Sequence, residues 1–103
     1  MNRLQYLLTK LAEEATEIGQ IALKTQQFSL DEICPNLPYS NKERCHQEVN
    51  DLLAIVEMLN REFNFGYIPD DGEIAAKINK VNKYYNYSID CGMVQEEIKH
   101  ELK

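Results

Sequence analysis

Apolar side chains recur every three or four residues along most of this chain, which is the spacing of one face of an α-helix. The first such stretch covers residues 3–25 and contains no proline, so it predicts one long amphipathic helix. Its apolar positions are Leu4, Leu7, Leu8, Leu11, Ala15, Ile18 and Ala22.

Residues 26–40 interrupt this pattern and predict a structured loop. The residues that break regular structure there are Pro35, Asn36 and Pro38. Ser29 followed by Glu32 could cap one short turn within the loop.

Two further helices are predicted after the loop. Ser40 and Glu43 form a capping box that opens the second helix, which runs to about Asn64. Asp70, Asp71 and Gly72 supply N-cap chemistry for the third helix. The apolar side of the third helix is Ile74, Ile78, Val81 and Tyr85.

The Cys91-Gly92 break ends the third helix, and Met93–Leu102 predicts a short last one with Val94, Ile98 and Leu102 on one side. No alternating pattern typical of strands and no repeat appears. We therefore expect an all-α helical bundle that forms a single domain over residues 1–103.

Composition narrows the classes of partner. Seventeen acidic and eleven basic residues give a formal charge of -6, which disfavours binding to nucleic acid polymers and to anionic membranes. No apolar run approaches the roughly 18 residues needed to span a bilayer. We expect a soluble, cytoplasmic protein with reduced thiols.

A zinc site from Cys34, Cys45, His46 and Cys91 is disfavoured because adjacent residues of a helix, such as Cys45 and His46, point to different sides.

Carboxylates occupy positions where a helix of this kind usually carries apolar residues. At about 100° per residue, Glu14 falls inside the apolar stripe of the first helix, between Ile21 and Leu7. Glu17 lies at the edge of that stripe, and Glu13 projects towards solvent or a second coordination shell.

The second helix repeats this arrangement. Glu48 lies within its apolar sector and Asp51 lies on the flank. If the two helices pack antiparallel, Glu14 and Glu17 face Glu48 and Asp51. Four carboxylates this close repel one another unless cations or protons offset their charge. All-oxygen ligands favour hard ions such as Mg²⁺ or Mn²⁺, which suit phosphate substrates.

A lone ExxE pair is usually an ordinary acidic helix face exposed to water. Two such pairs, each with one member embedded in an apolar stripe, favour the metal interpretation. None of Glu13, Glu14, Glu17 and Glu48 is followed three residues later by a histidine, which argues against a di-iron bundle at these carboxylates.

These residues resemble a known family. Glu13-Glu14-Ala15-Thr16-Glu17 and Glu48-Val49-Asn50-Asp51 are similar to the EExxE and ExxD motifs of the MazG-like all-α nucleotide pyrophosphohydrolases. The resemblance covers about residues 4–85. It implies that Mg²⁺ binds to Glu14, Glu17, Glu48 and Asp51 and that a nucleoside triphosphate is hydrolysed to the monophosphate and pyrophosphate. These four acids, together with Glu13 as a group that orients water, are the predicted catalytic residues.

Substrate contacts are predicted on the third helix. Lys77, Lys80 and Lys83 form a stripe there that could bind phosphates or simply face solvent. Lys83-Tyr84 resembles the start of the basic segment of the family, but Asn86 and Tyr87 stand where an arginine is expected. Candidates to stack on a base, each equally compatible with ordinary packing, are Tyr6, Phe28 and Tyr39.

Three helices give a thin core for a chain of this length. We expect a second copy to cover the wide apolar face of the second helix, giving a homodimer around a four-helix core, or a homotetramer. The alternative function is a non-catalytic acidic interaction or regulatory protein that retains the bundle.

Overall fold

The computed structural model describes residues 1–97, and within them the regular structure is helical: α1 (Arg3–Phe28), α2 (Asn41–Phe63) and α3 (Asp71–Asp90). The all-α prediction is confirmed. The chain divides into two compact units, residues 1–67 and the residues from 68 onward, which are described separately below. None of the helices in the described part of the chain is long and apolar enough to cross a membrane.

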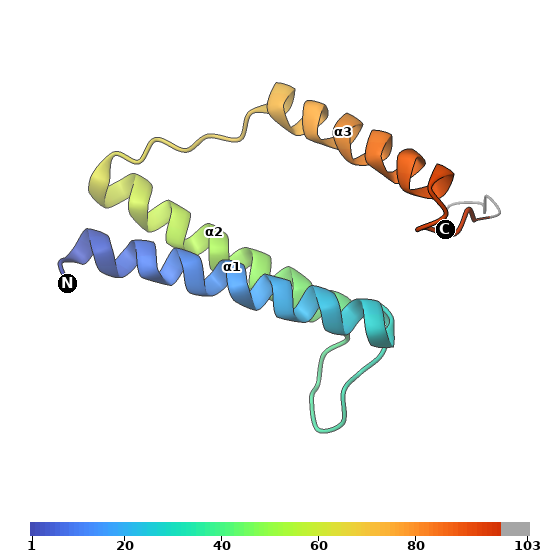
Figure 1. Ribbon diagram of the computed structural model, residues 1–103. Helices are drawn as coiled ribbons and strands as arrows, with labels where there is room; N and C mark the ends of the chain where they lie inside the picture. Colours follow the sequence, from blue (N-terminus) through green and yellow to red (C-terminus); the bar gives the residue numbers. More distant parts are fainter. Residues whose placement is uncertain (98–103) are drawn as a thin grey trace. The chain divides into compact units, whose positions relative to one another are not determined.

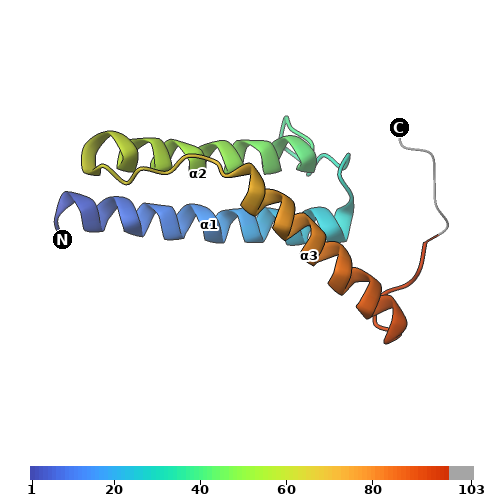
Figure 2. The same ribbon diagram turned by 90° about the horizontal axis from the view of Figure 1, so that it is seen from above.

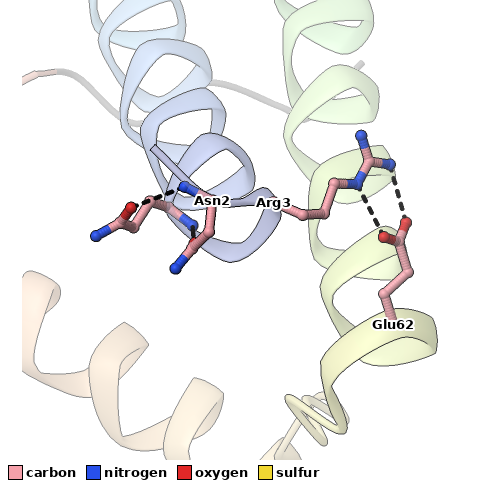
Figure 3. Close-up of polar contacts among 4 residues, drawn as sticks. Asn2, Arg3 and Glu62 are labelled. Carbon is pink, nitrogen blue, oxygen red and sulfur yellow. Dashed lines mark hydrogen bonds and ion pairs between the residues drawn. The ribbon is translucent and has the colours of Figure 1, made fainter.

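The start of each helix is fixed by a local cap. The predicted capping box at Ser40 is confirmed, because the Glu43 N–H donates to Ser40 Oγ at 3.2 Å and the Ser40 N–H donates to Glu43 Oε1 at 3.0 Å. Of the three residues predicted to supply the N-cap of α3, Asp70 is the one that caps it, accepting from the Glu73 N–H at 2.9 Å. Asn2 and Gln5 form a further capping box at α1 (Figure 3).

Helices α1 and α2 form an antiparallel hairpin (Figures 1 and 2). At one end Arg3 forms a bidentate ion pair with Glu62, in which Nε lies 2.9 Å from Oε1 and Nη2 lies 3.1 Å from Oε2 (Figure 3). At the other end Thr25 Oγ1 lies 3.4 Å from Cys45 Sγ. The hairpin buries a small apolar core of Leu7, Ile21 and Leu59.

The loop that joins α1 to α2 is ordered by its own hydrogen bonds. Helix α1 runs to Phe28, three residues beyond the prediction, and Ser29 with a φ of 86° is its C-cap and not the cap of a new turn. The tight turn lies at Pro35-Asn36 instead, where the Leu37 N–H donates to the Cys34 carbonyl at 3.0 Å. Asn36 has a φ of 69°, which asparagine tolerates better than most residues.

Asn41 anchors this loop to α2. It is 1% exposed, and its Nδ2 donates to the Ser29 carbonyl and to Glu32 Oε1, both at 2.9 Å. Its backbone N–H donates to the Glu32 carbonyl at 3.0 Å. One buried amide therefore holds both ends of the loop together.

Helix α3, considered by itself, contains no buried residue. Its predicted apolar side is exposed, with Ile74 at 47%, Ile78 at 55% and Val81 at 54%. The predicted single domain over residues 1–103 stays a prediction.

The prediction of a last helix is wrong for Met93–Glu97, which are not helical. The N–H groups of Met93 and Val94 both donate to the Ser88 carbonyl, and Gly92 has a φ of 76°, so the chain turns away from the helical path after Cys91. The remaining positions of that predicted helix, which include Ile98 and Leu102, lie outside the described residues.

Candidate metal centre

Three carboxylates from two helices meet between α1 and α2. One carboxylate oxygen from each of Glu14, Glu17 and Glu48 lies within 4.8 Å of the other two. Glu14 and Glu17 are one turn apart on α1 and Glu48 is on α2, so the antiparallel packing brings them together. In residues 1–97 no other set of three His, Cys, Asp or Glu side chains is this close, and the cysteines form no such group.

Burial separates these acids in the way the helical projection predicts. Glu14 and Glu48 are half-buried, whereas Glu17 is exposed. Oε2 of Glu14 and Oε2 of Glu48 are each buried without a hydrogen-bond partner. A buried acceptor without a donor costs free energy, and more so when it is ionised. Both carboxylates are therefore stabilised by either a proton or a cation.

Burial and the neighbouring carboxylates raise the pKa values of Glu14 and Glu48. Burial raises the pKa of Glu14, and the negative charges of Glu17 and Asp51 raise it further. Burial is also the largest cause that raises the pKa of Glu48, followed by the adjacent Glu17 carboxylate, which would share a proton bound to Glu48, and by the charges of Glu17, Asp51 and Glu14.

Asp51 and Glu13 lie at the edge of the site. Asp51 is exposed and is not one of the three acids that share the 4.8 Å cluster, although its charge acts on both Glu14 and Glu48. Glu13 is exposed and pairs with Lys10, with Nζ to Oε1 at 3.2 Å. The structure thus brings three of the four predicted metal ligands together and leaves Asp51 on the flank.

The predicted substrate residues on α3 belong to the other unit of the chain. Lys77, Lys80 and Lys83 are exposed, and Lys83 Nζ lies 5.9 Å from the centre of the Tyr84 ring. Their contact with phosphate stays a prediction.

Two cations beside the carboxylates were missed by the sequence analysis. Lys24 and Arg44 line the same groove between α1 and α2 as Glu17 and Glu48. The signal was present in the spacing: Lys24 follows Glu17 by seven residues and Arg44 precedes Glu48 by four, so each cation shares a helix face with an acid.

The donor set fits a hard divalent cation. The clustered ligand atoms are all carboxylate oxygens, they come from two helices that are tied together at both ends, and two of the buried oxygens lack any other partner. Oxygen-only donors of this kind suit Mg²⁺ or Mn²⁺ better than zinc or copper.

Because the pKa of Glu48 is raised, removing its charge is expected to increase the free energy of unfolding by an amount that depends on pH. A carboxyl whose folded pKa is above its unfolded value favours folding below the unfolded pKa, and this contribution is lost as the pH rises through the folded pKa. In metal-free buffer, Glu48→Gln should therefore be more stable than the wild type at pH 7, and the difference should shrink towards pH 4.

Thermal unfolding followed by circular dichroism across this pH range measures the effect. Glu57→Gln on the same helix is the control, since Glu57 is exposed and pairs with Arg61. A difference between Glu48→Gln and the wild type that grows as the pH falls would contradict the described environment of Glu48.

Comparison of the chain with protein-family models, with curated proteins and with solved structures gave no match in any of the three.

Proposed function

We propose that this protein is a Mg²⁺-dependent nucleoside triphosphate pyrophosphohydrolase of the MazG-like helical type. The observation that carries the proposal is the pair of buried, unpartnered oxygens of Glu14 and Glu48 next to Glu17. The resemblance of residues 13–17 and 48–51 to the motifs of that family supports it independently.

In this proposal Glu14 and Glu17 hold the ion from α1, and Glu48 holds it from α2. Asp51 completes the set from the flank of α2. Mn²⁺ would serve in place of Mg²⁺, because both are hard ions with oxygen ligands. A bound ion would supply positive charge for phosphate oxygens and would make water a better nucleophile at neutral pH.

The proposed reaction consumes one water and breaks the bond between the α and β phosphates, giving a monophosphate and pyrophosphate. In this proposal the carboxylates position the metal ion, and Glu13 orients the attacking water. Contacts between α1 and α2 at both ends of the hairpin, Arg3 with Glu62 and Thr25 with Cys45, keep the acids in register. Such a fixed arrangement suits catalysis by preorganised charge. Lys77, Lys80, Lys83 and Tyr84 are proposed substrate contacts.

The test is incubation with a panel of ribo- and deoxynucleoside triphosphates and Mg²⁺, with product identification. Monophosphate and pyrophosphate are expected, more readily from a deoxynucleotide. Diphosphate with orthophosphate would mean different chemistry. No product from any nucleotide would favour the alternative of a non-catalytic interaction or regulatory protein.

Metal binding can be tested without turnover. Calorimetry of the metal-free protein should show Mg²⁺ or Mn²⁺ binding that Glu48→Gln and Asp51→Asn each weaken by at least about tenfold. Glu57→Gln, which removes an equal charge from the same helix, should bind like the wild type. Equal affinities for the wild type and both site variants would disprove this site.

We also propose that the bundle is completed by a second copy. Apolar side chains remain exposed on α2, with Val49 at 43% and Leu53 at 49%, and along the apolar side of α3. Exposed apolar side chains that lie together on one face of a helix often mark a protein–protein contact. Light scattering at micromolar concentration should give a mass of at least twice 12.0 kDa. A folded protein at the monomer mass would refute the assembly.

A further inference from the structure

The loop between α1 and α2 borders an open cavity that the proposed metal chemistry does not use. This cavity has a volume of about 440 Å³, within the range of roughly 300 to 1,000 Å³ typical of small-molecule sites. Its apolar lining is Phe28 at the end of α1 together with Cys34, Pro35 and Leu37 of the loop. Figure 1 shows this loop at the end of the hairpin where α1 finishes and α2 begins.

The cavity adjoins the acidic groove through two shared residues. Lys24 and Arg44 line both the cavity and the groove that contains Glu17 and Glu48. Lys24 and Arg44 therefore lie between the acidic groove and a cavity that is lined by apolar side chains, including the exposed ring of Phe28, and also by Asn41 and Glu32.

Both cations are free to bind an anion. In the part of the chain that the structure describes, neither Lys24 nor Arg44 forms an ion pair, whereas Arg3, Lys10, Lys42 and Arg61 each have an acidic partner. Arg44 is half-buried and its Nη1 donates to Asn41 Oδ1 at 3.4 Å. The buried amide that anchors the loop thus also positions this guanidinium.

The groups of a nucleoside triphosphate match this arrangement, because its phosphates are anionic and its base is aromatic. A divalent ion held by the carboxylates would attract its phosphates, the two cations would offset the remaining negative charge, and the cavity beside an aromatic ring would accept a base. We propose that Lys24 and Arg44 bind the phosphates of the substrate and that the cavity beside Phe28 holds its nucleoside. This inference rests on the proposed function and names the residues that would recognise its substrate.

Separate probes test the two halves of the inference. Inorganic triphosphate with Mg²⁺ reports on the cations alone, and calorimetry should show that Lys24→Gln and Arg44→Gln each lower its affinity by about tenfold or more. The matched control is Lys42→Gln, which changes the net charge equally on a lysine that pairs with Asp31 and lines neither the groove nor the cavity. Lys42→Gln should bind triphosphate like the wild type.

The four α,β-methylene deoxynucleoside triphosphates, which resist cleavage of the α–β bond, report on the cavity. Phe28→Ala should lower the affinity for the best of them by about tenfold while leaving inorganic triphosphate unaffected, because only the nucleoside would stack on the ring. Phe65→Ala, which removes a ring of similar exposure outside the cavity, should change neither affinity.

The outcomes separate this inference from the proposed function. If the wild type binds Mg²⁺ and triphosphate but Lys24→Gln and Arg44→Gln bind triphosphate equally well, the inference is wrong and the metal site stands. If Lys42→Gln lowers the affinity for triphosphate as much as Lys24→Gln does, the effect comes from net charge alone, and the inference is overturned as well. If the wild type binds neither Mg²⁺ nor triphosphate, the proposed function fails, and the inference fails with it.

Discussion

Replacing Glu48 with glutamine is expected to lower the rate of pyrophosphate release by about two to three orders of magnitude. Glu48 is the acid that α2 contributes to the three-carboxylate cluster, and its buried Oε2 has no other partner. The substitution keeps the size of the side chain but removes the charge that would hold the ion. Initial rates with Mg²⁺ and the preferred nucleotide measure the loss.

Two comparisons make this result specific. Glu57→Gln should keep the wild-type rate, since Glu57 is exposed and pairs with Arg61 on the surface of α2. Lys77→Ala should have a smaller effect than Glu48→Gln, because one exposed cation would contribute less than a proposed metal ligand. A fully active Glu48→Gln enzyme with native circular dichroism would mean that the chemistry lies elsewhere.

Truncating Leu59 to alanine is expected to cost about 2 to 5 kcal/mol of the free energy of unfolding. Leu59 is 0% exposed and shares the small core of the α1–α2 hairpin with Leu7 and Ile21. Few other apolar residues of the hairpin are fully buried, so the loss is a large fraction of the stability that a domain of this size has.

Urea unfolding followed by circular dichroism measures this change. Leu23→Ala is the matched control, because Leu23 is 68% exposed and its truncation should change stability by less than about 0.5 kcal/mol. Equal midpoints for the two variants would contradict the described packing of α1 on α2.

The sequence determined the helices and their starts, because caps and helical periodicity depend on residues a few positions apart. Ser40 with Glu43 and Asp70 with Glu73 needed no distant partner to begin α2 and α3. The same periodicity placed Glu14 and Glu48 inside the apolar stripes, and both side chains are half-buried in the structure.

Local pattern was misleading where a backbone turn competes with periodicity. The spacing of Val94, Ile98 and Leu102 predicts a helix, yet Met93–Glu97 are not helical. The positive φ of Gly92 lets two successive N–H groups close on the Ser88 carbonyl, which ends α3 and directs the chain away from it.

Only the tertiary structure decided which groups share a site. The register of α1 against α2 depends on contacts between residues far apart in sequence, such as Arg3 with Glu62 and Thr25 with Cys45. That register brings Glu48 to Glu14 and Glu17 and leaves Asp51 on the flank.

The same packing placed Lys24 and Arg44 on both sides of one groove and let the buried Asn41 fold the loop over an apolar cavity. Helical spacing assigns each residue to a face of its own helix, but it carries no information about which residue of another helix lies opposite. The sequence therefore determined the helices and the faces that carry the acids, whereas the contacts between helices decided which acids and cations meet.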